Sequence, residues 1–355
     1  MTARTRADLD RLPLYVPGRT VPGAIKLASN EVSAGPLPSV VAAIAAAGAA
    51  VNRYPDNGAT ALVTRLAQRF DLAEDQVSVG CGSVSLCQQL VQATCTERDE
   101  VLFGWLSFEA YPIVAGVVGA RTAMVPLTPD HRLDVDAMLA AITPATRLVF
   151  ACTPNNPTGT ALTAAELRHL IDSVPRDVLV VIDQAYREFN DDPDLPDGID
   201  VAREAWARGQ DNVAVLRTFS KAYGLAGLRV GYCAAPKPIT EAVRKVYVPF
   251  AVNAIAQVAA IASLDAEDEL LARCRDVVAE RGRVRSALLD LGYAVPPSQA
   301  NFVWLPLGEK TVAFNEHCLD HNVVVRAFAS HGARVTIGSP DENDVFLAAA
   351  QSFPR

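Results

Sequence analysis

A lysine flanked by hydroxyl side chains ends an apolar segment of the chain. Residues 212–221 (NVAVLRTFSK) read as a buried strand that closes on Thr218, Ser220 and Lys221, and Arg229 follows eight residues later. Burial and a nearby cation both favour the neutral form of an amine, and a neutral amine can form a Schiff base with an aldehyde. A surface lysine after a strand explains so short a motif equally well, so its interpretation depends on the rest of the chain.

Two further apolar runs end in polar side chains that suit an aromatic ligand. In residues 151–159 (ACTPNNPTG), two prolines and a glycine predict a rigid turn from which Asn156 can bond an aromatic oxygen. In residues 180–186 (VVIDQAY), a strand ends at Asp183, and Tyr186 follows. A buried carboxylate needs a partner, and a pyridine nitrogen beside it would stay protonated. Taken singly, an Asx turn and a capping aspartate remain open alternatives.

A glycine-rich turn between a strand and a helix predicts a phosphate site. Residues 79–85 (VGCGSVS) place Ser83 near the start of the helix, where backbone N–H groups and the helix dipole attract anions. Arg229 carries five fixed donors that suit the same phosphate. The four motifs together (the turn, Asn156, Asp183 with Tyr186, and Lys221 with Arg229) are far more specific than any one of them.

Composition excludes several classes of function. The 355-residue chain has a net charge of −8 and a pI near 5.2, which disfavours nucleic-acid binding. No apolar stretch is long and pure enough to span a bilayer, and the N-terminus has no apolar signal region, so we expect a cytoplasmic protein that does not bind membranes. Seven scattered cysteines and five histidines show no zinc-site spacing, so no metal is expected.

Alternating strands and helices predict an α/β fold with a mostly parallel sheet covered on both faces. Helices are expected at 84–94 and 164–173, the second opening with a Thr163–Glu166 capping box. The acidic segment 190–198 is expected to be a solvated surface loop. The expected strands are 76–79, 100–103, 122–125, 146–152, 178–182, 213–217 and 228–233.

The pattern changes near residue 238 and predicts a smaller α+β domain. A long helix over 267–291, with apolar residues at three- and four-residue spacing, is followed by shorter elements. These are strands at 301–305, 323–328 and 334–337 and helices at 311–320 and 341–353. The predicted organisation is an N-terminal segment (1–35) that is part of the small domain, a large domain (36–245) and a small C-terminal domain (246–355).

The motifs, in this order, resemble fold-type I aminotransferases that depend on pyridoxal 5'-phosphate (PLP). The similar branch contains the histidinol-phosphate aminotransferases and the aromatic amino-acid aminotransferases, and the resemblance spans essentially the whole chain. It implies that Lys221 is the catalytic, Schiff-base lysine and that Asp183 pairs with the ring nitrogen. The other implied cofactor contacts are Tyr186 and Asn156 on the ring oxygen, Phe108 stacked on the ring, and Ser83, Val84, Thr218, Ser220 and Arg229 on the phosphate.

The same resemblance implies substrate contacts and a homodimer. Tyr54 matches a tyrosine that reaches the phosphate in the neighbouring subunit, which would complete each site only in a dimer. Arg334 matches the arginine that takes the substrate α-carboxylate. Tyr15 and Asn30 match a segment that lies over the substrate. The remaining substrate-site candidates are Arg326 and Phe328.

The resemblance leaves the substrate less certain than the reaction. The sequence GSVSLCQQ (82–89) departs from the acidic version common in histidinol-phosphate enzymes and resembles the aromatic aminotransferases of actinobacteria. Phe328 could line an aromatic side chain, and it could equally belong to the core. We therefore predict transfer from Phe, Tyr or Trp to 2-oxoglutarate. Histidinol phosphate is the alternative, because Arg326 and Arg334 could bind its phosphate. Less favoured alternatives are a PLP lyase or decarboxylase and a non-enzymatic PLP module.

Overall fold

Seven strands form the main sheet of the computed structural model, which describes residues 3–12, 14 and 18–354. Their spatial order is β2-β8-β7-β6-β5-β3-β4. Of the described strands in this sheet, β8 alone runs opposite to the other six, so the predicted α/β class with a mostly parallel sheet is confirmed. The strands are β2 (Val77–Gly80), β3 (Glu100–Trp105), β4 (Arg121–Pro126), β5 (Thr146–Cys152), β6 (Leu179–Asp183), β7 (Val213–Thr218) and β8 (Gly231–Ala234).

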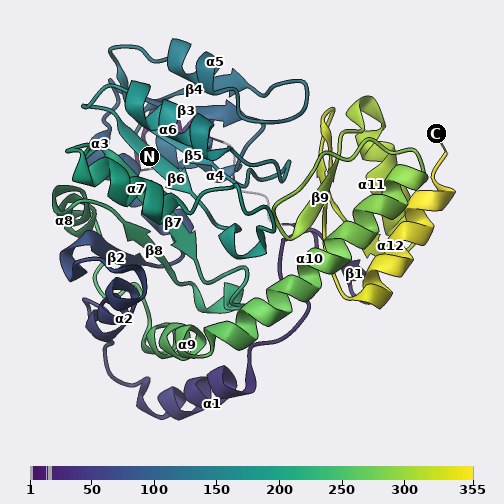
Figure 1. The fold of residues 1–355 in the computed structure, drawn as a ribbon, viewed down its shortest axis with the longest axis horizontal. Coiled ribbons are helices and arrows are strands. Elements are labelled where there is room, and N and C mark those ends of the chain that lie inside the picture. Colours follow the sequence, from purple (N-terminus) through teal and green to yellow (C-terminus); the bar gives the residue numbers. More distant parts are fainter. Residues whose placement is uncertain (1–2, 13, 15–17, 355) are drawn as a thin grey trace.

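Helices cover both faces of the sheet (Figure 1). The central strands β5, β6 and β7 are buried on both faces, which is why they read as continuous apolar runs. The predicted capping box opens α6, where the Thr163 hydroxyl accepts from the Glu166 N–H. One face is covered by α3 (Ser83–Thr94), α4 (Ala110–Val117) and α8 (Lys237–Lys245), and the other by α2 (Thr60–Phe70), α5 (Val135–Ala140), α6 (Ala164–Ser173), α7 (Gly198–Ala207) and α9 (Ala254–Asp265).

A second, smaller layer lies at the far end of the long helix α10 (Glu267–Asp290) (Figure 1). It contains a three-stranded antiparallel sheet, in the order β11-β12-β9, and the short parallel pair β1-β10. These strands are β1 (Ile25–Lys26), β9 (Phe302–Leu305), β10 (Val323–Val324), β11 (Arg326–Phe328) and β12 (Gly332–Thr336), and the helices are α11 (Thr311–Asp320) and α12 (Pro340–Ser352). Helix α1 (Pro38–Ala47) packs on α9, and short 3-10 turns lie at Ala7–Arg11, Gly48–Ala50, Glu74–Gln76, Arg187–Phe189, Ala226–Leu228 and Gly308–Lys310.

Helix α10 belongs to both hydrophobic cores. Leu270 and Cys274 pack into the core of the main sheet, while Val284 and Leu288 pack into the core of the small one. Helix α9 also shares the main-sheet core. The division after residue 245 stays a prediction.

A buried arginine ties α10 to the loop after β6. Arg281, only 4% exposed, donates from Nη1 to the carbonyls of Phe189 (2.8 Å) and Ala300 (2.9 Å), and its Nη2 lies 2.8 Å from Asp191 Oδ1. The loop 190–198, expected to be solvated, also supplies Asp197 to the buried Arg217 at 2.7 Å. Buried guanidinium groups need such partners, so part of this acidic loop is structural.

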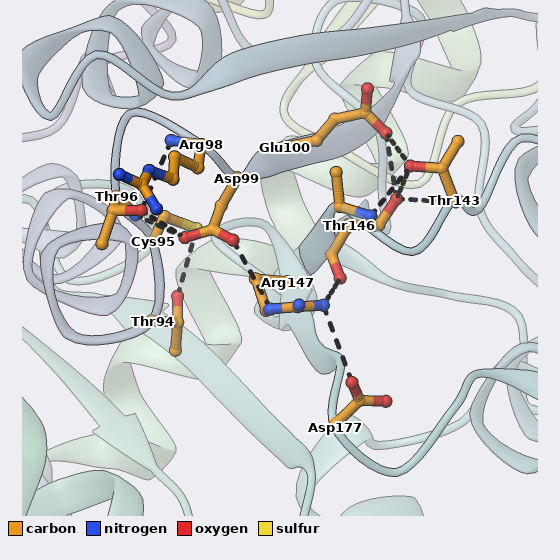
Figure 2. Close-up of polar contacts among 11 residues, drawn as sticks. Thr94, Cys95, Thr96, Arg98, Asp99, Glu100, Thr143, Thr146, Arg147 and Asp177 are labelled. Carbon is orange, nitrogen blue, oxygen red and sulfur yellow. Dashed lines mark hydrogen bonds and ion pairs between the residues drawn. The ribbon is translucent and has the colours of Figure 1, made fainter.

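A polar network closes the edge of the main sheet where β3 and β5 begin (Figure 2). Arg147 lies 3.5 Å from Asp99 and 3.6 Å from Asp177, and Glu100 Oε1 accepts from the hydroxyls of Thr143 and Thr146. These contacts satisfy the polar groups at the amino ends of the strands. The polar motifs predicted from the sequence lie at the opposite, carboxyl edge.

The seven cysteines are free thiols, and six of them are buried. Within residues 3–12, 14 and 18–354, no helix combines the length and the apolar character that crossing a bilayer requires.

Candidate active site

The carboxyl ends of β5, β6 and β7 open into a cavity of about 190 Å³. Parallel strands place these ends at one edge, where open α/β sheets bind their ligands, and the pairing sets Cys152 beside Asp183 and Asp183 beside Leu216. The predicted site residues that line the cavity are Asn30, Ser83, Val84, Phe108, Asn156, Asp183, Tyr186, Thr218, Ser220, Lys221, Arg229, Arg326 and Arg334.

Two of the described predicted site residues, Phe328 and Tyr54, do not line this cavity. Phe328 is buried behind it, with its ring 5.7 Å from the Arg326 guanidinium and 5.8 Å from that of Arg334. Tyr54 lies on the surface with 83% of its area exposed. Tyr15 lies outside the described residues. The Phe328 ring packs against the guanidinium groups of Arg326 and Arg334, and its contact with substrate stays a prediction.

Lys221 reaches into the cavity, and among the described residues no carboxylate forms an ion pair with it. Its Nζ donates to the carbonyl of Ser29 at 3.0 Å and lies 5.9 Å from the centre of the Tyr186 ring. Burial lowers the pKa of Lys221 to about 7, and repulsion from Arg334 acts in the same direction. A substantial fraction of this amine is therefore neutral near pH 7, as a nucleophile or a general base requires.

Asp183 is a buried carboxylate with one oxygen committed. Its Oδ2 accepts from the Tyr111 hydroxyl at 2.8 Å, whereas Oδ1 is buried with no hydrogen-bond partner among the described residues. Burial raises the pKa of Asp183 to about 6, and the bond from Tyr111 opposes that rise. A cationic ring nitrogen is the kind of partner that would satisfy Oδ1.

The anion end of the cavity is the start of α3. Gly82, at φ 77°, precedes Ser83, and a Cβ at that position would collide with the Arg229 guanidinium. Arg229 donates to Ser220 Oγ at 3.3 Å and to the Ala226 carbonyl at 2.8 Å. Free helix N–H groups beside a guanidinium and hydroxyls suit a phosphate dianion.

The opposite end of the cavity is held by the small sheet and the N-terminal segment. Arg334 on β12 donates to Asn156 Oδ1 and, at 2.7 Å, to the Ala28 carbonyl. Asn30, at φ 56°, donates to the Tyr186 hydroxyl at 2.9 Å. Arg334 is 6% exposed, so its position is fixed before a ligand arrives. A planar guanidinium held in this way suits a carboxylate.

An ion pair flanks the cavity beside Phe108. Arg326 Nη2 lies 2.8 Å from both carboxylate oxygens of Glu109, across 217 residues of sequence. The side chains are 15% and 33% exposed. Sequence reasoning named Arg326 but missed Glu109 and Tyr111. No motif marks these two residues, although both lie within three residues of Phe108, in the turn into α4.

Pyridoxal phosphate, which the resemblance implies, fits this set of side chains. Asp183 Oδ1 suits the ring nitrogen, the Gly82–Ser83 turn with Arg229 suits the phosphate, and Lys221 offers an amine between them. Phe108 lines the same cavity and presents an aromatic face for stacking. The polar groups of the cofactor thus each meet a side chain of matching chemistry.

Comparison with known proteins gives consistent matches over nearly the whole chain. Residues 22–349 match the family model "Aminotransferase class I and II". An aromatic amino acid aminotransferase of Rhodococcus jostii (strain RHA1) is 59% identical over 352 residues, which cover 99% of this chain and 96% of the relative. One from Mycobacteroides abscessus is 56% identical over 353 residues, which cover 99% of this chain and 100% of the relative.

Solved structures share the fold at lower sequence identity. The crystal structure of histidinol-phosphate aminotransferase from Sinorhizobium meliloti, in complex with pyridoxal-5'-phosphate, superposes with a TM-score of 0.89 at 28% identity. It covers 99% of this chain, and this chain covers 97% of it. The chain is thus 56–59% identical to the two relatives named for aromatic amino acids and 28% identical to this structural neighbour, which is named for histidinol phosphate.

The low pKa of Lys221 can be measured in the protein without cofactor. Competitive acetylation with acetic anhydride, read by mass spectrometry of the Lys221 peptide, should reach half of its maximal rate near pH 7. Arg334→Met removes a repelling cation and should move this midpoint to higher pH. Arg283→Met, at an exposed ion pair on α10, should leave the midpoint unchanged. A wild-type midpoint near the ordinary lysine value would contradict the burial argument.

Proposed function

This chain belongs to the class I and II aminotransferase family, and from that premise we propose that it transfers the amino group of an aromatic L-amino acid to 2-oxoglutarate. The products are an aromatic 2-oxo acid and L-glutamate. Enzymes of this family use pyridoxal phosphate. The curated relatives named for aromatic amino acids support the choice of substrate class.

The observation that carries this choice is the ion pair between Arg326 and Glu109. The phosphate of histidinol phosphate would have to share Arg326 with a carboxylate 2.8 Å away, whose charge repels a dianion. A neutral aromatic side chain needs no cationic partner, is not repelled by Glu109, and can lie against Phe108. Glu109 engages only Nη2 among the described residues, so Nη1 and Nε can still take the singly charged distal carboxylate of 2-oxoglutarate.

One set of side chains would hold the cofactor, and another would bind the substrate and transfer its proton. When bound, pyridoxal phosphate supplies an aldehyde that can accept nitrogen and a ring that withdraws electrons from the substrate. Asp183 holds the ring nitrogen protonated, Asn156 and Tyr186 hold the ring oxygen, and Phe108 covers one face. The start of α3, with Thr218, Ser220 and Arg229, holds the phosphate. Together these contacts would hold the ring in one orientation.

Lys221 and Arg334 act on the substrate. Arg334 grips the α-carboxylate and so places the substrate Cα beside Lys221. Burial and Arg334 favour the neutral form of the Lys221 amine near pH 7. This amine would remove the proton from the substrate Cα as a general base and, once protonated, would act as the general acid of the same proton transfer. The Ser29 carbonyl, which accepts from Nζ at 3.0 Å, orients the amine. Asn30 lies over the substrate.

We propose that the enzyme is a homodimer in which Tyr54 serves the partner's site. Tyr54 is 83% exposed, stacks on Phe250 at 4.6 Å and does not line its own cavity. The exposed apolar surface around it would be covered by a second copy. Val41, Val51, Val248 and Val258 are further exposed apolar side chains, on α1, on α9 and on the segments next to these helices in the sequence.

Steady-state kinetics test the substrate assignment. The specificity constant for phenylalanine with 2-oxoglutarate should exceed that for histidinol phosphate with 2-oxoglutarate by at least about a hundredfold, since a poorly paired charge in a binding site costs about 2 to 5 kcal/mol. Glutamate and the 2-oxo acid should appear together, without carbon dioxide or ammonia. A larger constant for histidinol phosphate would overturn the assignment.

Glu109→Gln serves as the matched variant for this experiment. It keeps the side-chain shape and removes the repelling charge, so the specificity constant for histidinol phosphate should rise about tenfold. The constant for phenylalanine should change less than about threefold, because its side chain is neutral. An equal change for both substrates would show that Glu109 does not discriminate by charge.

Subunit mixing tests the position of Tyr54. Tyr54→Phe should weaken cofactor binding about tenfold through the loss of one bond to a phosphate. In a mixed dimer of Tyr54→Phe and Lys221→Ala chains, one site combines Lys221 with an intact Tyr54 if the tyrosine crosses the interface. That site should regain wild-type cofactor affinity. A mixed dimer that retains the defect would place Tyr54 in its own subunit's site.

A further inference from the structure

Tyr111 connects two of the side chains that face the cofactor ring. It lies on α4, is fully buried, and donates its hydroxyl to Asp183 Oδ2 at 2.8 Å. Its ring also meets the edge of Phe108, with centroids 5.5 Å apart and planes at 84°. A single side chain thus contacts both the ring-nitrogen residue and the ring-stacking residue.

The surroundings of Tyr111 leave it no alternative position. Its ring stacks on Phe150 with centroids 4.2 Å apart and planes at 5°, and Phe103 lies 5.6 Å away. Burial raises the pKa of Tyr111 well above its ordinary value, so the hydroxyl stays protonated and remains a donor. Phe150 lies on β5 and Asp183 on β6, so two adjacent strands and α4 fix the geometry.

The bond from Tyr111 determines which oxygen of Asp183 remains available. With Oδ2 occupied, the described residues leave Oδ1 without a partner. No cationic side chain contacts Asp183 in the described part of the chain, and besides Tyr111 only the nearby Ala185 N–H opposes the rise in the pKa of Asp183. Without the phenol, burial would favour the protonated acid, which cannot hold a ring nitrogen as a cation.

We propose that Tyr111 is a positioning residue that keeps the Asp183 carboxylate ionised, with Oδ1 directed at the cofactor ring nitrogen, while its ring fixes Phe108 against the ring face. This inference rests on the assignment of Asp183 to the ring nitrogen in the proposed function. Tyr111 itself touches neither substrate nor cofactor, since it does not line the cavity.

Cofactor affinity provides the test, because it separates this role from a general loss of packing. Dissociation constants are measured on the apoenzyme for pyridoxal phosphate and for 1-deazapyridoxal phosphate, in which carbon replaces the ring nitrogen. Tyr111→Phe should weaken pyridoxal phosphate binding about tenfold or more, the effect of one hydrogen bond to a charged group. Its affinity for the deaza analogue should stay within about threefold of wild type.

Tyr293→Phe is the matched control. Tyr293 is also buried and donates to the Ala350 carbonyl at 2.7 Å, but it lies in the core of the small sheet. It should retain wild-type affinity for both ligands. In an Asp183→Asn background, adding Tyr111→Phe should cost less than about threefold, because the group it acts through has gone.

The outcomes distinguish an error in the assignment of Asp183 from an error in the role of Tyr111. If the wild type binds both ligands equally, the assignment of Asp183 to the ring nitrogen is wrong and the role of Tyr111 falls with it. If the wild type prefers pyridoxal phosphate and Tyr111→Phe weakens both ligands equally, or neither, only the role of Tyr111 is overturned. Should Tyr111→Phe not fold, 3-fluorotyrosine at position 111 keeps the shape, and its altered donor strength should change the affinity for pyridoxal phosphate alone.

Discussion

The structure depends on keeping two ionisable groups of opposite charge in one cavity without letting them pair. Burial moves the pKa of Asp183 up to about 6 and that of Lys221 down to about 7, so each group is close to losing its charge near neutral pH. Each is held by other partners, Asp183 by the phenol of Tyr111 and Lys221 by the Ser29 carbonyl. Bonding to each other would satisfy both and leave nothing for a ligand. A ligand with a cationic nitrogen at one end and an aldehyde at the other uses both.

The fold supplies this separation through strands that end side by side. Asp183 ends β6 and Lys221 follows β7, and parallel pairing of the two strands sets both groups at the carboxyl edge of the sheet. The small sheet adds Arg334, whose positive charge lowers the pKa of Lys221 and which would bind the substrate carboxylate. The long helix α10, tied through Arg281 to the loop after β6, keeps that sheet beside the cavity. Arg334 therefore influences the protonation of Lys221 and would also position the substrate.

Much of this arrangement could be predicted from the sequence, because strand ends in a parallel sheet converge wherever they lie along the chain. Asp183, Lys221 and the Gly82–Ser83 turn follow apolar runs that mark those ends. Contacts that depend on tertiary packing could not be predicted in this way. Glu109 meets Arg326 across 217 residues, and Tyr111 reaches Asp183 from a helix on the face of the sheet. The position of Phe328 also depends on tertiary packing, because its sequence allows both a core and a substrate role, and its ring packs against the guanidinium groups of Arg326 and Arg334.

The central claim, that Lys221 is the amine the cavity prepares for the cofactor aldehyde, can be tested on the protein directly. The protein is incubated with pyridoxal phosphate at neutral pH, reduced with borohydride and digested, and the modified lysine is located by mass spectrometry. The account predicts a single modified residue, Lys221, and a loss of the label in Lys221→Ala. Modification of an exposed lysine such as Lys237 or Lys310 with Lys221 left free would contradict it.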